Sequence, residues 1–263
     1  MNTRLTFTNL EQQPSGITIK SPKELECMRQ AGWVVANILS ILQKAIAPGM
    51  KTKDLDVIAS RDIKRLGAKP SFKGYRGFPA TICVSINEEI VHGIPGNKLI
   101  KEGDLVKIDA GAIVDGFQGD SAITVGVGNI SQKAQTLIEV TRTALSVGIS
   151  AAKCGARIGD VSAAIQEFVE TQGYSVVREY VGHGIGRALH EEPQVPNYGE
   201  PGKGPLLRPG MALAIEPMVN LGDWRTRSLK DGWTVVTADG SLSAHFENTI
   251  AITEDEAEIL TRL

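Results

Sequence analysis

The sequence predicts an α+β fold built from two related halves. Two helices followed by a set of strands occur twice along the 263 residues, which is typical of an internal repeat. Several residue types recur at an offset of 106 or 107 positions: Gly49, Asp54, Gly67, Gly103, Val106, Ile108 and Asp109 correspond to Gly155, Asp160, Gly173, Gly210, Leu213, Ile215 and Glu216. Chance could produce such matches, because the segments between them do not align. A true duplication would place one carboxylate at the end of an equivalent strand in each half.

No low-complexity segment or long linker separates the two halves, which favours one domain. We expect an N-terminal arm over residues 1–20 and a single domain over residues 21–263, with halves at about 21–128 and 129–263. A chain of this length can bury a substantial hydrophobic core.

Capping signals and apolar spacing predict the helices. Ser21-Pro22-Lys23-Glu24 is typical of a capping box with proline at the first helical position. Apolar residues then recur at three- and four-residue steps until Pro48-Gly49 ends the helix. Further helices are expected over about 54–66, 132–152 and 160–172. Short apolar runs between turn residues predict strands at 84–86, 105–108, 122–125, 211–219, 233–236 and 245–253.

The composition excludes several classes of protein. Lys and Arg number 28 against 30 Asp and Glu, and the net charge of -2 argues against binding of nucleic acid or membrane surfaces by bulk charge. No apolar run approaches the roughly 18 residues of a membrane span. Cys27, Cys83 and Cys154 are too few and too widely spaced for a disulfide framework or a cysteine zinc site. Because residues 1–20 also lack the apolar core of a secretion signal, we expect a cytoplasmic protein.

Asp109 and Asp120 are the first candidates for a functional site. Asp115-Gly116 between them is a strong two-residue hairpin turn, which would pair Asp109 with Ala122. Asp120 would then lie diagonally opposite Asp109 on the same face, roughly 7–8 Å away at the backbone. Two carboxylates directed at one point repel each other unless a cation lies between them. The alternative is that a bulge turns one of the two toward solvent.

Two glutamates and three histidines extend the candidate set. Glu216 interrupts an apolar strand, and Glu247 lies on a strand where alternation places it on one face with His245. Both acids could instead protect an edge strand, an alternative that Pro217 strengthens for Glu216. His183 and His190 occupy one glycine-rich segment, and His92 lies in a similar Gly/Pro loop. An isolated histidine in such a place is more often structural than catalytic.

The charge balance of these residues indicates metal binding. Asp109, Asp120, Glu216 and Glu247 carry about four negative charges with His183 neutral, which two divalent cations would neutralise. Oxygen ligands with one imidazole suit Mn, Fe or Co better than a structural zinc. Two metals roughly 3.5–4 Å apart generate a hydroxide near neutral pH and polarise a carbonyl, which is hydrolase chemistry.

Several segments together carry a resemblance to a known family. They are residues 81–89, Val91-His92-Gly93-Ile94-Pro95, Ile108-Asp109 with Gly119-Asp120-Ser121, residues 183–193, Ile215-Glu216-Pro217-Met218, Asp231-Gly232-Trp233-Thr234 and Phe246-Glu247-Asn248-Thr249. From about Ser21 to the C-terminus, the chain resembles the type I methionine aminopeptidases. The resemblance implies the pita-bread fold, with duplicated helix–helix–strand halves around a curved antiparallel sheet. It also implies removal of the initiator methionine from nascent chains whose second residue is small and uncharged, by attack of a hydroxide that bridges two metals.

The resemblance assigns a role to each candidate residue. It implies that two divalent ions, for which Co, Fe, Mn and Zn all fit, are held by Asp109, Asp120, His183, Glu216 and Glu247. Asp120 and Glu247 would bridge the ions, and Glu216 is proposed in the family as the general base, a role that conflicts with its being a ligand. His92 would contact substrate and stabilise the leaving nitrogen, while His190 would hydrogen-bond the scissile carbonyl. The methionine side chain would enter a pocket lined by Tyr75, Phe78, Cys83, Leu189 and Trp233.

Departures from the family pattern fall around the expected site. Phe72 and Arg76 stand where relatives often have Cys and His at the pocket mouth, and Gln118 and Asn248 each replace a frequent His. None of these changes removes a metal ligand, and His245 is assigned a structural or supporting role. Arg76 either narrows the rim for the second residue or is an ordinary solvated side chain.

Two other functions remain open from the sequence. The first is a prolidase or aminopeptidase P activity, although such relatives usually carry an additional N-terminal domain. The second is a non-catalytic binding protein on the same fold, although such proteins lose metal ligands. The expected partner is the N-terminus of a nascent polypeptide, with the ribosome as a further candidate, and a monomer is expected with no nucleic-acid specificity and no membrane contact.

Overall fold

The computed structural model describes residues 16–263, so most of the predicted N-terminal arm lies outside the described residues. The last residues of that arm are attached to the domain. Ile17 forms an isolated bridge with Glu192, and Lys20 Nζ lies 2.8 Å from Glu191 Oε2. These contacts hold the start of the first helix against the segment that follows His190.

Four helices form where the sequence predicts them, within a few residues at each end. They are α1 (Pro22–Ala45), α2 (Thr52–Arg65), α3 (Gln132–Ala151) and α4 (Ile158–Thr171). The predicted capping box is present at α1, where the Ser21 side chain accepts from the Glu24 N–H and Glu24 accepts from the Ser21 N–H. None of the helices within residues 16–263 is long and apolar enough to cross a membrane.

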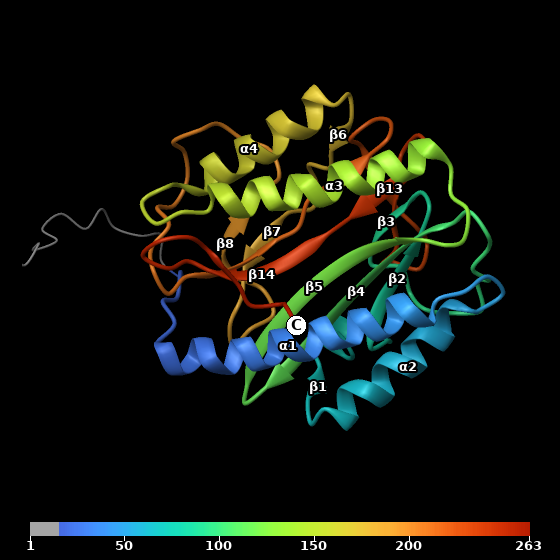
Figure 1. Ribbon diagram of the computed structural model, residues 1–263, viewed down its shortest axis with the longest axis horizontal. Coiled ribbons are helices and arrows are strands. Elements are labelled where there is room, and N and C mark those ends of the chain that lie inside the picture. The colour runs from blue at the N-terminus through green and yellow to red at the C-terminus, as the bar shows by residue number, and fades with distance from the viewer. Residues whose placement is uncertain (1–15) are drawn as a thin grey trace, which may run out of the picture.

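All strand pairings between named strands are antiparallel, in one large sheet and two small ones. The large sheet has the order β1 (Lys69–Pro70), β4 (Leu105–Val114), β5 (Phe117–Gly126), β14 (Glu247–Ala251), β9 (Ala212–Ile215), β7 (Gly182–Gly184), β8 (Glu191–Val195), with β2 (Ile82–Ile86) beside β4 and β15 (Glu258–Ile259) beside β14. One small sheet contains β13 (Ser243–His245), β10 (Met218–Asn220) and β6 (Ser175–Val176), and the other β11 (Thr226–Ser228), β12 (Val235–Thr237) and β3 (Glu89–Val91). In Figure 1 the central strands run between the α1–α2 pair and the α3–α4 pair.

Each helix pair covers its own hydrophobic core. The first core joins α1 and α2 to β2 and β4, and it includes Leu42, Leu55, Val84 and Ile108. The second joins α3 and α4 to β9, β10 and β14, and it includes Leu145, Ile165, Ile215, Val219 and Ile250. Burying one such aliphatic side chain is worth about 1.5–3 kcal/mol. The strands of the large sheet therefore pack against one helix pair from each half of the chain.

Local geometry supports the duplication that the sequence suggests. Asp54 at the start of α2 accepts from the Lys51 N–H at 2.8 Å, and Asp160 at the start of α4 accepts from the Arg157 N–H at 2.7 Å. Three glycine pairs of the repeat have matching left-handed φ angles. The angles are 89° at Gly49 and 84° at Gly155, 76° at Gly67 and 81° at Gly173, and 86° at Gly103 and 87° at Gly210. Equivalent positions of the two halves thus adopt equivalent backbone conformations.

Two predicted strands are each divided in the structure. The segment 211–219 was expected to be continuous, but β9 ends at Ile215 and β10 begins at Met218 in a different sheet. Pro217 explains the break, because it has no N–H to donate to a strand ladder. The segment 245–253 is divided likewise at Phe246, whose N–H donates to the Pro217 carbonyl at 3.4 Å. The two breaks lie side by side, and each is next to a predicted site glutamate.

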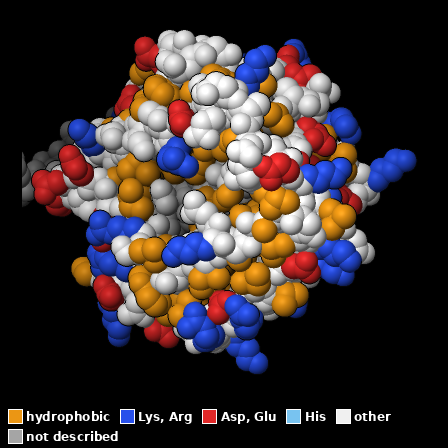
Figure 2. All heavy atoms as spheres, turned by 45° about the vertical axis from the view of Figure 1, so that its right-hand side comes forward, with side chains coloured by type: hydrophobic (Ala, Val, Ile, Leu, Met, Phe, Trp, Pro, Cys, Tyr) orange, Lys and Arg blue, Asp and Glu red, His pale blue; other side chains and the backbone are white. Residues whose placement is uncertain are grey.

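Charged side chains of both signs are scattered over the surface. Figure 2 shows Lys and Arg interspersed with Asp and Glu on the face drawn. This distribution agrees with the net charge of -2.

Candidate metal centre

Asp109 and Asp120 lie on the hairpin that the sequence predicts. Asp109 pairs with Ala122, and Asp120 pairs with Gly111 two residues farther along β4. Asp115 and Gly116 form the turn with left-handed φ angles of 48° and 80°. The register is therefore confirmed, and no bulge turns either aspartate away, since both line one cavity.

The other candidate ligands come from the strands next to this hairpin. Glu247 pairs with Ala122 at the start of β14, Glu216 follows the last residue of β9, and His183 on β7 pairs with Ala214. The five candidate ligands thus lie on or directly after five consecutive strands of the large sheet, in the order β4, β5, β14, β9, β7. The sheet brings together residues that span 139 positions from Asp109 to Glu247 in the chain.

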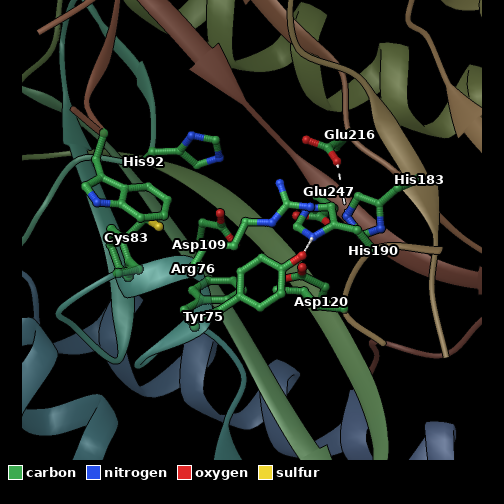
Figure 3. A pocket seen from close by; sticks show the side chains of 14 residues that line it. Tyr75, Arg76, Cys83, His92, Asp109, Asp120, His183, His190, Glu216 and Glu247 are labelled. Atoms are coloured by element: carbon green, nitrogen blue, oxygen red, sulfur yellow. Dashed lines mark hydrogen bonds and ion pairs between the residues drawn. The ribbon is translucent and has the colours of Figure 1, made fainter. Parts of the chain in front are cut away.

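The side chains of the five candidate ligands point toward one another in the cavity (Figure 3). Carboxylate oxygens of Asp120 and Glu247 and a ring nitrogen of His183 all lie within 4.8 Å of one another. His183 Nε2 lies 3.6 Å from Glu216 Oε1. Asp109 lines the same cavity, which has a volume of about 150 Å³.

In the described part of the chain, the buried carboxylates lack hydrogen-bond donors, and their pKa values are raised. Asp109 Oδ1, Asp120 Oδ1 and Glu247 Oε1 are buried without a hydrogen-bond partner among the described residues. Burial raises the pKa of Asp109 to about 7, and it raises the pKa of Asp120 well above its usual range with help from the nearby Glu247 carboxylate. Burial also lowers the pKa of His183 to about 3, which leaves a neutral imidazole. Buried acceptors that lack donors, with a neutral imidazole beside them, fit a divalent metal site.

The three histidines expected at the site differ in their surroundings. Burial lowers the pKa of His92 to about 4, and its ring contacts Trp233 and Tyr180 edge to face at centroid distances of 6.4 and 5.7 Å. His190 lies beside His183, with ring centroids 4.2 Å apart. Both His92 and His190 line the cavity that contains the carboxylates. Tyr180 was not among the residues expected from the sequence, and its position just before the glycine-rich segment was the only signal.

An apolar slot adjoins the carboxylates. Its walls include Tyr75, Phe78, Cys83, Leu189 and Trp233, the five residues expected for a methionine side chain. Phe78 and Trp233 contact each other edge to face at 5.0 Å. Phe72 and Arg76 complete the lining, and Figure 3 shows Arg76 extending across the pocket. Every residue that the sequence indicated for ligand binding, catalysis or substrate contact thus borders one cavity.

Two of the four residues that depart from the family pattern, Gln118 and Asn248, make hydrogen bonds outside the cavity. Gln118 Oε1 accepts from the Ser71 hydroxyl at 2.6 Å, and Asn248 Nδ2 donates to Thr261 Oγ1 at 2.9 Å. His245 lies closer, with Nε2 3.7 Å from Glu216 Oε2. Burial lowers the pKa of His245 to about 3, so it faces Glu216 as a neutral ring.

Comparison with known proteins identifies the family. Metallopeptidase family M24 matches residues 26–254. A methionine aminopeptidase 1 of Bacillus subtilis is 57% identical over 94% of this chain and all of its own length. The crystal structure of a Thermotoga maritima methionine aminopeptidase superposes with a TM-score of 0.93 at 52% identity, covering 94% of this chain and 100% of that one. A Pyrococcus furiosus prolidase, at 24% identity and a TM-score of 0.77 over 93% of this chain and 65% of its own, shows only that the fold is shared. The family model, the fold and these relatives agree, and the chain belongs to metallopeptidase family M24, among its methionine aminopeptidases.

Proposed function

We propose that this protein removes the N-terminal methionine from peptides and nascent proteins by metal-dependent hydrolysis. The observation that carries the proposal is the apolar slot beside five converging metal-ligand candidates in one cavity. The slot would take the methionine side chain, whose thioether makes favourable contacts with aromatic rings of about 0.3–1.5 kcal/mol. The carboxylates would then lie beside the substrate's free amine and its first peptide bond.

We assign Asp109, Asp120, His183, Glu216 and Glu247 as the residues that would hold two divalent ions, and Asp120 and Glu247 as the ligands that the two ions would share. The charge of two divalent ions would equal the four negative charges of the ionised carboxylates. Cobalt, iron, manganese and zinc are all compatible with these ligands. When bound, the ions supply a water acidified toward neutral pH and a Lewis acid for the scissile carbonyl.

The histidines act on the substrate. His190 donates a hydrogen bond to the scissile carbonyl oxygen, and this bond strengthens as negative charge develops there. His92 contacts the substrate and stabilises the leaving nitrogen. We also assign Glu216, which is already a metal-ligand candidate, as the general base that would receive the proton of the attacking water. Arg76 at the mouth of the cavity limits the size of the second residue.

The cellular setting follows from the same features. The three cysteines are free, which suits a reducing cytoplasm. The polypeptide substrate emerges from the ribosome, so docking there is consistent with the proposal, as is action as a monomer. A prolidase-like activity is not favoured, since the prolidase likeness shows the fold alone. A purely binding function is not favoured either, because all five candidate ligand residues lie at one cavity.

A peptide panel with metal analysis tests the proposal. Met-Gly-containing and Met-Ala-containing peptides should be cleaved by the metal-loaded protein, N-acetyl-Met peptides should resist, and Xaa-Pro peptides should remain intact. Metal content is measured on the same sample. Cleavage of Xaa-Pro peptides, or efficient cleavage of acetylated ones, would contradict the assignment of the pocket.

A further inference from the structure

His183 and His190 lie ring against ring, but the Nδ1 atoms of the two rings have opposite kinds of partner. His183 Nδ1 lies 2.9 Å from the carbonyl oxygen of Gly184. A carbonyl can only accept, so His183 Nδ1 must carry the proton and Nε2 must carry the lone pair. That lone pair faces the carboxylates, as a metal ligand requires.

His190 Nδ1 lies 2.8 Å from the hydroxyl oxygen of Tyr75. A phenol is a good donor and a poor acceptor, while an unprotonated imidazole nitrogen is a strong acceptor. The bond is therefore best made with the Tyr75 O–H donating to His190 Nδ1, which leaves the imidazole proton on Nε2.

Two further contacts fix the orientation of the His190 ring. The Tyr75 ring stacks on it at a centroid distance of 5.3 Å and an interplanar angle of 24°. The His183 ring lies 4.2 Å away. Figure 3 shows Tyr75 and His190 joined across the mouth of the pocket. Tyr75 thus contributes an oriented hydroxyl as well as an apolar wall.

We propose that Tyr75 is a positioning residue that sets His190 as an Nε2–H donor, while the Gly184 carbonyl sets the adjacent His183 in the opposite tautomer. The proposal rests on the proposed function, because an Nε2–H donor is what the scissile carbonyl oxygen needs. A His190 ring with its proton on Nδ1 would present a lone pair to that oxygen and would repel it. Two neighbouring histidines are thereby given different tasks, ligand and donor, by the partner of a single ring atom.

Tautomers are measured by NMR of protein labelled at histidine, with and without zinc, which is diamagnetic. In the unmodified protein His190 should be the Nε2–H tautomer and His183 the Nδ1–H tautomer. Tyr75→Phe should leave His183 unchanged and give His190 a mixture of tautomers. A His190 that is Nδ1–H in the unmodified protein, or one that does not respond to Tyr75→Phe, overturns the proposal.

Kinetics separate positioning from simple pocket lining. Tyr75→Phe keeps the ring, so kcat on a Met-Gly peptide should fall about fivefold to tenfold, the size of one net hydrogen bond, with KM little changed. In a His190→Ala background the same substitution should have no further effect on kcat. A rise in KM that persists without His190 would show that Tyr75 only lines the slot. If the unmodified protein cleaves no Met peptide, the proposed function fails while the tautomer measurement still stands.

Discussion

Removing the metal should destabilise the protein more at neutral pH than at mildly acidic pH. Burial raises the pKa of Asp109 from 3.8 to about 7. Burial, together with neighbouring carboxylates, also raises the pKa values of Asp120, Glu216 and Glu247 well above their usual range. These shifts describe the folded chain without metal, in which the carboxyl groups retain protons that the unfolded chain would release.

The sign and size of the effect follow from linkage. A group whose pKa is higher in the folded state contributes stability below its unfolded pKa, and that contribution is lost as the pH rises through the folded pKa. For Asp109 the loss extends from about pH 4 to about pH 7 and amounts to roughly 4 kcal/mol, at 1.36 kcal/mol per pKa unit. The other three acids act in the same direction. Metal-bound carboxylates are already ionised, so the loaded protein is spared this loss.

Thermal unfolding between pH 5 and pH 8 measures the effect directly. The melting temperature of the metal-loaded protein minus that of the chelator-treated protein should widen as the pH rises. Exposed acids elsewhere contribute equally to both forms and cancel in the difference. Calorimetric titration with metal in buffers of different ionisation enthalpy should show release of at least one proton per chain at pH 7. A constant difference in melting temperature, or binding without proton release, would refute the reasoning.

Three further predictions concern single residues. Asp120→Asn and Glu247→Gln should each lose both metal ions after dialysis, because a shared carboxylate serves two cations; two tightly held ions per chain in either variant would exclude sharing. His190→Ala should lower kcat by about 100- to 1000-fold with a small change in KM, as expected for a donor to a developing oxyanion, and near-normal kcat with a raised KM would indicate uniform binding instead. Arg76→Ala should modestly increase cleavage of Met-Leu and Met-Lys peptides relative to Met-Ala in competition assays, whereas an unchanged ranking would mean that Arg76 is a solvated side chain without a role in selection.

Local signals in the sequence predicted much of the fold. The Asp115-Gly116 turn determined the register of its hairpin, so the relation of Asp109 to Asp120 could be derived from the sequence alone. Capping and stop signals located the helices because those interactions lie within one turn of the chain. The divided strands were missed, since an apolar run looks the same whether it stays in one sheet or passes between two. Pro217 was interpreted only as an edge signal, although it marks the division itself.

The contacts that refine the site were beyond prediction because they are distant in sequence. The Tyr75–His190 hydrogen bond joins residues 115 positions apart, and neither residue carries a local signal for the other. The same holds for Tyr180 against His92 and for His245 against Glu216. The roles of individual residues came from the family resemblance, whereas the residues alone supported only a cluster of acids that requires cations.

The site lies at the seam between the two halves, and side-chain hydroxyls hold that seam together. The strands β5 and β14 pair through only two residue pairs, Glu247 with Ala122 and Asn248 with Ser121. Hydroxyls supply further bonds there: the Ser121 hydroxyl donates to the Glu247 carbonyl at 2.5 Å, and Thr249 Oγ1 both accepts from the Asp120 N–H at 3.0 Å and donates to the Asp120 carbonyl at 2.8 Å. These bonds fix the backbone of Asp120 to β14 and the backbone of Glu247 to β5, and these are the two residues proposed to be shared by both metals. Because the ladder between β5 and β14 is short, the hydroxyls of Ser121 and Thr249 add side-chain hydrogen bonds where the two halves meet, directly at Asp120 and Glu247.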